Sequence, residues 1–247
     1  MHEQDAVADD GWRIHSRHLP PPTRGDLARR GAKITGVFAR RLAPVAARQL
    51  RRKGSSPRAD VPFARPLRLA FEDLGGTFVK FGQLVASSPG LFGAELSEEF
   101  RSCLDTGPAV PAEQIRSLVE DDLGRSIEDA FAWFDPIPVG RASIAVVHRA
   151  RLHDGRDVAV KVLRPGVDRS VATDLSLMEP LFELLSRATG AQLAGATLQQ
   201  LDGLRTQIGE ELDLRNEARA LTLFGALIAA SGFTALVVPE PVLSLSG

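Results

Sequence analysis

Residues 138–165 read PVGRASIAVVHRARLHDGRDVAVKVLRP and predict a β-hairpin. Ile144–His153 is rich in β-branched residues and contains no Gly or Pro. Asp154-Gly155 follows as a two-residue turn signal, because glycine tolerates the positive φ angle that a tight hairpin requires. Arg156–Leu163 then returns as the second strand. We therefore expect the folded part of the chain to be organised around this hairpin.

The second strand alternates between two kinds of side chain. A period of two puts Val158, Val160 and Val162 on one face, with Ala159 and Lys161 on the other. A lysine between valines is unfavourable unless an anion meets it, and a small alanine beside it leaves room for a flat group. The V-A-V-K pattern has the form of the kinase strand whose lysine reaches phosphates and a helix glutamate. The alternative is an edge hairpin with Lys161 in water, and these four residues alone leave both readings open.

The composition is ordinary for a soluble globular protein, with 247 residues, 44% hydrophobic and 25% charged. A single cysteine, Cys103, excludes an intrachain disulfide and a cysteine-based metal site, and the five histidines show no ligand spacing. The N-terminus lacks the apolar segment of a signal peptide, and no apolar run approaches the roughly 20 residues of a membrane-spanning helix. We expect a cytoplasmic protein, at most peripheral at the inner membrane surface.

The net charge of −1 conceals a strongly basic segment. Residues 24–53 hold ten Lys and Arg and one acid, Asp26, whereas the remainder carries 20 basic and 30 acidic residues. We predict that residues 1–25 are disordered and that residues 26–53 form a basic amphipathic helical arm, with Asp26 as a candidate N-cap and an interruption at Pro44. Its apolar stripe comprises Ile34, Val37, Phe38 and Leu42.

Three interpretations of this arm stay open. It could lie on an anionic membrane surface, pack on the folded domain as a solvated helix, or remain a flexible arm. Nucleic acid is not an expected partner, because no aromatic platform or recognised DNA-binding motif accompanies the charge.

The rest of the chain is predicted to be a linker followed by helices around the hairpin. Residues 54–66 are the linker by composition, and the folded domain is expected over residues 67–247. Thr77 is a candidate N-cap, Pro111 suits a first helical turn and Gly124 a C-terminal stop. The predicted helices are Leu67–Leu74, Thr77–Ser87, Glu95–Leu104, Pro111–Leu123, a short one from Ser126, Asp168–Ala188 with an interruption at Pro180, and Thr197–Ala230. The tail, Ala235–Leu245, reads as two short strands split by Pro239 and Pro241.

Four motifs in order resemble the UbiB/AarF atypical kinase-like family. Lys80-Phe81-Gly82-Gln83, within LGGTFVKFGQLVASSPGLF, is similar to its K-x-G-Q motif. Pro138–His148 resembles its Ala-rich loop, and Val158–Lys161, followed by Arg164-Pro165-Gly166, resembles its nucleotide-strand lysine motif. Residues 211–218, ELDLRNEA, look like its E-x-D helix. The resemblance covers residues 67–247, and the order and spacing of the motifs are far more specific than any one of them.

The resemblance implies an α+β kinase-like N-lobe, a small antiparallel sheet with a hairpin and family-specific N-terminal helices, without the C-lobe. It implies ATP or ADP with Mg²⁺ as cofactors. Lys161 would neutralise α/β-phosphate charge, Glu211 would hold Lys161 through an ion pair, and backbone N–H groups around residues 140–143 would cradle phosphates. The residues expected to bind the nucleotide are Lys161, Glu211, Ala159, Gly140, Ala142 and Ser143.

Five further residues belong to family motifs. Lys80, Gly82 and Gln83 are expected to cap the nucleotide pocket. Asp213 and Glu217 belong to the E-x-D segment. Residues two apart on an ideal helix point about 200° apart, so we expect Asp213 to serve the K-x-G-Q helix while Glu211 faces Lys161. The alternative for these acids is a solvated helix face with i, i+4 pairing, here Glu211 to Arg215.

The sequence also departs from the family pattern. The loop reads Gly140-Arg141-Ala142-Ser143 instead of A-A-A-S, and Val146 replaces the usual Gln, which leaves nucleotide preference open. No H-R-D or D-F-G-like sequence occurs, and residues 235–247 contain no Asp. We therefore predict no catalytic residue and no metal ligand here, and no phosphoryl transfer by this chain alone.

Two functions follow from the resemblance. The first is the ATP-binding N-lobe of a UbiB-like atypical kinase or ATPase, linked to quinone or isoprenoid lipid metabolism, including ubiquinone biosynthesis, with a separately encoded C-lobe as a partner. The second is a non-catalytic regulatory or membrane-surface binding remnant of the family.

Overall fold

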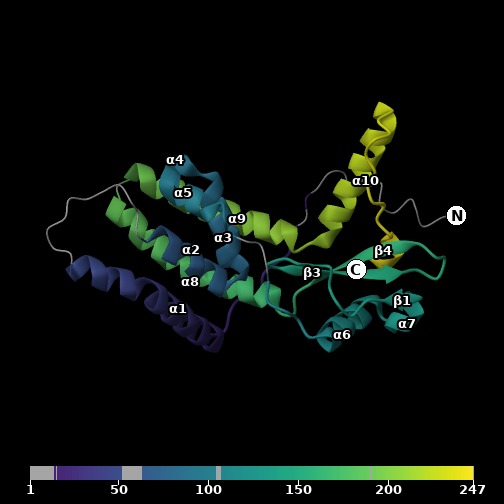
Figure 1. The fold of residues 1–247 in the computed structure, drawn as a ribbon, viewed down its shortest axis with the longest axis horizontal. Helices are drawn as coiled ribbons and strands as arrows, with labels where there is room; N and C mark the ends of the chain where they lie inside the picture. Colours follow the sequence, from purple (N-terminus) through teal and green to yellow (C-terminus); the bar gives the residue numbers. More distant parts are fainter. Residues whose placement is uncertain (1–13, 15, 52–62, 104–106, 190, 247) are drawn as a thin grey trace. The chain divides into compact units, whose positions relative to one another are not determined.

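The computed structural model describes residues 14, 16–51, 63–103, 107–189 and 191–246. The chain forms two compact units. The larger unit comprises Leu19–Arg205, and the smaller one combines the N-terminal residues up to His18 with Thr206–Gly247. Figure 1 shows the elements coloured along the sequence. Each unit is described by itself.

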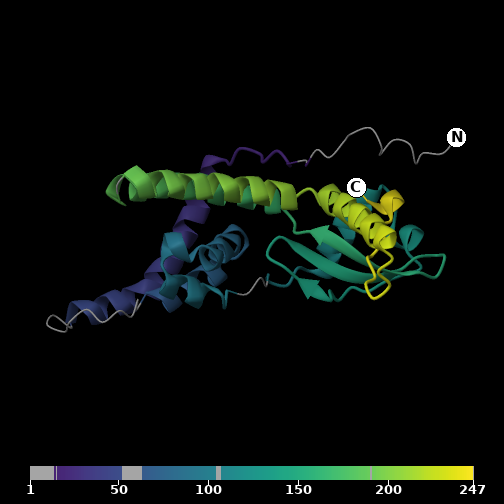
Figure 2. The same cartoon turned by 90° about the horizontal axis from the view of Figure 1, so that it is seen from above.

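The larger unit contains a group of helices and a small sheet, which gather at opposite ends in both views (Figures 1 and 2). The helical group comprises α1 (Arg24–Arg51), α2 (Ala64–Leu74), α3 (Gly76–Ser87), α4 (Pro89–Phe92), α5 (Ala94–Phe100) and α8 (Val167–Thr189). The sheet group comprises α6 (Ala112–Leu123), α7 (Ile127–Ala130), β1 (Trp133–Phe134), β2 (Gly140–Arg141), β3 (Ala145–Arg151) and β4 (Asp157–Leu163). This arrangement confirms the predicted α+β fold with a small antiparallel sheet.

Helix α1 begins two residues earlier than predicted, and the described part of it reaches Arg51. Its N-cap is Thr23, whose Oγ1 accepts from the Asp26 N–H at 3.1 Å, while the Asp26 carboxylate accepts from the Thr23 N–H at 3.3 Å. This reciprocal pair is a capping box, so Asp26 occupies the third helical position and its prediction as the N-cap was wrong. The helix continues through Pro44 without the predicted interruption. Most of the segment predicted to be disordered, including residues 1–13, lies outside the described residues.

Two glycines join α2 to α3. Gly75 has φ 66° and Gly76 has φ 48°, values that favour glycine. Gly75 is the N-cap of α3, so Thr77 lies in the first turn and its prediction as the cap was wrong. Helix α2 begins at Ala64, inside the predicted linker. Residues 52–62 of that linker lie outside the described residues.

The core of the helical group is a cluster of aromatic rings around Phe71. Its ring centroid lies 5.5 Å from that of Phe78 and 5.2 Å from that of Phe100, both edge-on, which is the preferred geometry of aromatic pairs. Phe81 lies 5.8 Å away and Phe38 of α1 lies 6.2 Å away. One phenylalanine of α2 therefore joins α1, α3 and α5.

The remaining helices of the larger unit follow the predictions with three changes. The N-cap of α7, Ser126, accepts from the Asp129 N–H, and Gly124 ends α6 in the left-handed conformation, both as predicted. Pro111 precedes α6 as its N-cap. Helix α5 ends at Phe100, four residues earlier than expected. Helix α8 continues through Pro180, where an interruption was predicted.

Strand β3 is the central strand of the sheet. It pairs with β4 along one edge, and on the other edge with β1 and β2, all antiparallel. The β3–β4 connection is the predicted hairpin, which is confirmed. The predicted two-residue turn at Asp154-Gly155 was wrong. The Leu152 N–H donates to the Arg156 carbonyl at 2.9 Å, so the turn contains three residues, and Gly155 is the last of them, with φ 89°.

The smaller unit contains the end of α9 (Ala191–Glu211) and all of α10 (Leu214–Ser231). The single helix predicted over Thr197–Ala230 is therefore two helices. A short 3-10 helix, Leu243–Leu245, replaces the two strands predicted in the tail. Pro239 and Pro241 each remove a backbone donor from a segment that would need it to pair as a strand.

Candidate functional site

Strand β4 presents its motif on one face. Val158, Val160 and Val162 are half-buried, whereas Ala159 and Lys161 are exposed. This is the predicted alternation. An alanine and a lysine on the open face of a sheet contribute little to packing, so the structure offers no core role that would explain this pair.

The pairing register places three residues in one row across three strands. Gly140 of β2 lies opposite Val147 of β3, and Val147 lies opposite Lys161 of β4. Neighbouring strands are about 4.8 Å apart, so the Cα atoms of Gly140 and Lys161 are separated by about 10 Å. The row, called the Gly140–Lys161 row below, joins the predicted phosphate loop to the predicted phosphate lysine.

The loop between β2 and β3 is closed by its own backbone. The Ala142 N–H donates to the Ala145 carbonyl at 2.9 Å. That N–H is occupied in this conformation, so a phosphate nest over residues 140–143 would have to use the other N–H groups. Ser143 is only 5% exposed, and its hydroxyl is not presented to solvent.

The side chain of Arg164 holds this loop in place through hydrogen bonds to backbone carbonyls. Its Nε donates to the Ala142 carbonyl at 2.9 Å and its Nη1 donates to the Pro108 carbonyl at 2.8 Å. The Gly107 N–H donates to the Arg141 carbonyl at 3.2 Å. A Cβ on Gly107 would lie 2.4 Å from the Ala142 carbonyl oxygen, so only glycine fits there. The positioning role of Arg164 was not predicted, and its only sequence signal was the resemblance of Arg164-Pro165-Gly166 to a family motif.

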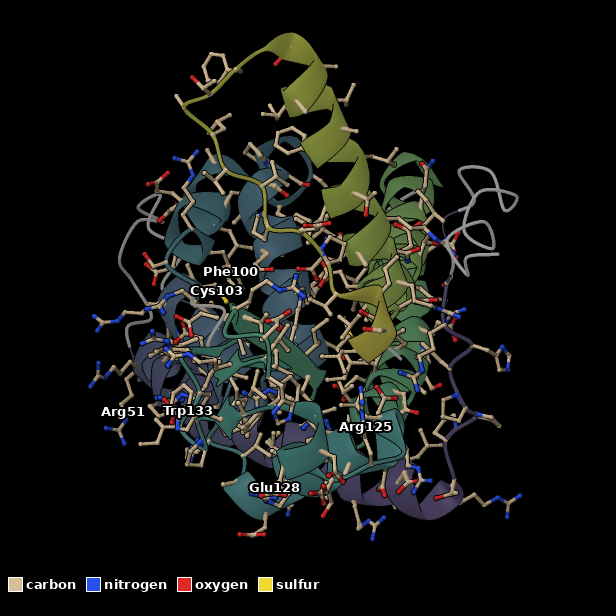
Figure 3. All side chains as sticks on the ribbon, turned by 90° about the vertical axis from the view of Figure 1, so that its right-hand side faces the viewer. Arg51, Phe100, Cys103, Arg125, Glu128 and Trp133 are labelled. Atoms are coloured by element: carbon tan, nitrogen blue, oxygen red, sulfur yellow. The ribbon has the colours of Figure 1, made fainter. Side chains whose placement is uncertain are left out.

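The K-x-G-Q helix, α3, combines half-buried polar side chains with a buried glycine. Lys80 and Gln83 are half-buried, whereas Gly82 is buried. A Cβ on Gly82 would lie 3.0 Å from Cys103 Sγ and 3.1 Å from a Phe100 ring carbon. Both neighbours can be followed in Figure 3. The glycine of this motif therefore has a packing role, since it lets α3 approach α5 closely.

An ion pair ties α1 to α8 beside the start of α3. Arg30 Nε lies 2.5 Å from Asp174 Oδ1, and Arg30 Nη2 lies 2.8 Å from Asp174 Oδ2. Arg30 also donates to the Leu74 carbonyl, and its guanidinium lies 5.7 Å from the centroid of the Phe78 ring. Burial raises the pKa of Asp174, and the hydrogen bonds from Arg30 oppose this shift. We call this arrangement the Arg30–Asp174 clamp.

The same side of α1 carries its apolar residues. Phe38 packs against the rings of Phe71 and Phe78, and Asp73 of α2 binds both Arg40 and Arg41. Hydrogen bonding from Arg41 is the main cause that lowers the pKa of Asp73. Helix α1 is thus packed on the domain. Inserting its apolar face into a bilayer would require α1 to leave the domain.

The E-x-D segment coincides with a break between helices. Glu211 is the last residue of α9, and its carboxylate accepts from Gln207 Nε2 at 3.2 Å. Asp213 is the N-cap of α10, where it accepts from the Arg215 N–H and also binds the Arg215 guanidinium at 2.6 Å and 2.8 Å. Glu217 lies exposed in the first turn of α10. The argument from an ideal continuous helix, which placed the two acids about 200° apart, therefore does not apply.

The predicted ion pair between Lys161 and Glu211 stays a prediction. Lys161 belongs to the larger unit and Glu211 to the smaller one. Within the described ranges, no group of three or more His, Cys, Asp or Glu side chains could hold a metal ion. In the same part of the chain, no helix has the length and apolar character needed to cross a membrane.

Comparison with known proteins identifies relatives of this chain. The sequence profile of the ABC1 atypical kinase-like domain matches residues 102–246. A chloroplastic aarF domain-containing protein kinase of Arabidopsis thaliana is 38% identical over 173 residues, which are 68% of this chain and 31% of the relative. The "probable protein kinase UbiB" of Marinobacter nauticus is 38% identical over 152 residues, covering 62% of this chain and 28% of that protein.

A solved structure of a Mycobacterium tuberculosis protein in complex with erythromycin is also similar. It is 27% identical, with a TM-score of 0.40, and the match covers 81% of this chain and 46% of that one. The chain spans less than a third of the length of the two curated relatives.

Proposed function

Because the chain belongs to the ABC1 atypical kinase-like family, which includes UbiB and aarF-domain proteins, we propose that it binds ATP or ADP along the Gly140–Lys161 row. The observation that carries the proposal is the strand register, which aligns the phosphate loop with an exposed lysine. Lys161 would neutralise phosphate charge, and Ala159 leaves room for the flat base next to it. Glu211 would pair with Lys161 when the nucleotide cleft is formed.

Phosphoryl transfer would require a second lobe. Mg²⁺ would accompany the nucleotide, and the acids that hold the ion and accept the proton would come from that lobe. Several large apolar side chains of α10 and the following segment are exposed and would suit such a partner. They are Phe224, Leu227, Phe233, Leu236 and Val237. With that lobe, the activity would be that of an atypical kinase or ATPase in quinone or isoprenoid lipid metabolism; without it, we expect no turnover.

Peripheral membrane association is the second part of the proposal. Arg24, Lys33, Arg48 and Arg51 of α1 are exposed, and basic groups near an anionic leaflet contribute about 1 kcal/mol each. Because Phe38, on the apolar face of α1, packs against Phe71 and Phe78, this binding would be electrostatic and sensitive to salt. It would place the protein at the cytoplasmic face of a membrane.

Titration of the purified chain with a fluorescent ATP analogue and Mg²⁺ tests the nucleotide site. We expect Lys161→Ala to weaken binding at least ten-fold, about 1.4 kcal/mol, whereas Arg156→Ala, in the turn of the same hairpin, should bind as the wild type does. Equal binding by wild type and Lys161→Ala would refute the assignment. Turnover near 1 s⁻¹, of kinase size, that vanished in Lys161→Ala would refute the need for a second lobe.

Adding a separately encoded C-lobe to the purified chain distinguishes a split enzyme from a non-catalytic regulatory protein. Restored ATP hydrolysis after mixing the chain with that lobe supports a split enzyme. Nucleotide binding without restored hydrolysis supports a regulatory member of the family.

A further inference from the structure

A basic pocket of about 270 Å³ lies between α1 and α8. It is formed by side chains of the larger unit, on different elements from the Gly140–Lys161 row. The charged and hydroxyl side chains that line it are Asp26, Arg29, Arg30, Lys33, Arg169, Ser170 and Thr173. Four cations therefore converge from two helices on one small space with one carboxylate.

Two of these cations are balanced by carboxylates. Arg29 Nη2 lies 2.7 Å from Asp26 Oδ1, and Arg30 binds Asp174 behind the pocket wall. Lys33 and Arg169, both exposed, supply the positive charge that these two carboxylates do not balance. Like charges gathered in a concave site raise the local potential and attract anions.

We propose that this pocket, the α1–α8 pocket, binds a phosphate-bearing anion. Arg169 offers a planar fork of donors, Lys33 a point charge and Ser170 a hydroxyl, which together suit a tetrahedral anion with several acceptor oxygens. The volume of about 270 Å³ lies just below the roughly 300–1,000 Å³ of small-molecule sites. The pocket therefore suits a phosphate monoester rather than a whole nucleotide.

A lipid headgroup and a free phosphate ester share this chemistry. The pocket lies on α1, whose exposed cations are also the proposed membrane contact, so a headgroup would occupy the pocket while the rest of α1 faces the bilayer. A free ester would bind with no vesicle present. The site itself does not depend on the nucleotide proposal, because the residues of the hairpin take no part in it.

The test compares two variants that remove the same charge from the full chain. Lys33→Gln/Arg169→Gln removes the unbalanced cations of the pocket, and Arg65→Gln/Arg125→Gln removes two exposed arginines elsewhere. Circular dichroism checks that both variants fold. The probes are glycerol 3-phosphate in solution, followed by calorimetry, and vesicles of phosphatidylcholine with or without phosphatidic acid, followed by sedimentation.

We expect the pocket variant to bind at least ten-fold more weakly than the wild type to one of these probes, and the control variant to bind as the wild type does. Binding of glycerol 3-phosphate assigns the site to a free ester, and binding only to phosphatidic acid vesicles assigns it to a headgroup. No binding of either probe by the wild type, or equal loss in both variants, overturns the proposal. Binding of the fluorescent ATP analogue should be unchanged in the pocket variant, which keeps this outcome separate from that of the nucleotide site.

Discussion

The two lysine motifs of the chain use their small residues in opposite ways. In α3 the glycine of Lys80–Gln83 is buried against Phe100 and Cys103, so the motif is partly a packing motif. In β4, Ala159, two residues before Lys161, is exposed, so burial does not require a small side chain there. The difference shows that a motif residue explained by packing carries less information about function than one left on an open face. Substitutions should therefore damage α3 through stability and β4 through binding.

The largest expected loss of stability comes from the clamp that holds α1 beside α3. Arg30→Ala should lower the free energy of unfolding by about 3–5 kcal/mol, because it leaves the carboxylate of Asp174 buried without its partner. Urea unfolding monitored by circular dichroism measures this change. The matched change Arg29→Ala, at a side chain that is 81% exposed, should have a much smaller effect. Similar losses in both variants would show that the clamp does not stabilise this end of α3.

The clamp also predicts a dependence on pH. Burial raises the pKa of Asp174 in the folded protein, and the loss of Arg30 should raise it further. The folded state then binds this proton more tightly than the unfolded chain does, so stability falls as the pH rises through the folded pKa. Arg30→Ala should therefore regain stability, relative to wild type, as the pH falls from 7 toward the ordinary pKa of an aspartate, about 3.9. A constant difference between the two proteins over this range would contradict the assignment.

The glycine of α3 gives the next largest effect. Gly82→Val should destabilise the protein by about 1–3 kcal/mol, because the added atoms collide with Phe100 and Cys103. Gly90→Val, in α4, is the control, since nothing lies within 4 Å of the Cβ position there. Denaturant midpoints of the two variants measure the difference. If Gly82→Val is as stable as Gly90→Val, the close approach of α3 and α5 is wrong.

The E-x-D segment extends the comparison to a third motif. Asp213→Ala should remove about 0.5–2 kcal/mol of stability by deleting the N-cap of α10. Asp213→Asn keeps a capping oxygen, so it should retain most of this stability while losing the charge. Thermal unfolding of the two variants separates the capping role from a role of the charge. Equal losses in both would assign the effect to the ion pair with Arg215.

The smallest effect on stability is expected on the open face of β4. Ala159→Leu should change the free energy of unfolding by no more than about 0.5 kcal/mol, because the site is exposed. The same substitution should weaken binding of the fluorescent ATP analogue at least ten-fold, since the larger side chain fills the space proposed for the base. Unchanged binding would place the base elsewhere.

The hairpin could be predicted from the sequence because its signals are local. Alternating valines and Asp154-Gly155 determine both the faces and the turn within 20 residues. The helix boundaries were harder. Pro44 and Pro180 were expected to interrupt helices, since an internal proline costs about 3 kcal/mol, but both helices continue. Packing along helices of 28 and 23 residues can offset that cost. A local sequence pattern does not reveal such packing, so the continuation of these helices could not be predicted.

The break between α9 and α10 was missed for a related reason. Residues on both sides of it favour helix, and only the capping ability of Asp213 marks the end of one helix and the start of the next. The brace of the phosphate loop could not be predicted at all. Arg164 and Ala142 are separated by 22 residues, and no local pattern connects an arginine to one particular carbonyl at that distance. The family motifs indicated which residues matter, whereas the contacts show what Gly82, Asp213 and Arg164 do.

The unequal lengths of the strands around β3 have a consequence for motion. Strand β4 pairs with β3 over seven residues, whereas β2 pairs with it over only two. Local opening needs the least free energy where the fewest backbone hydrogen bonds must break. Opening the loop at residues 140–143 would break the short pairing of β2 and the hydrogen bonds from Arg164 and Gly107, while Lys161 stays paired in β4. In hydrogen exchange, the amides of β2 should exchange well before those of β4. The Gly140–Lys161 row thus joins a strand with long pairing, β4, to a strand with short pairing, β2.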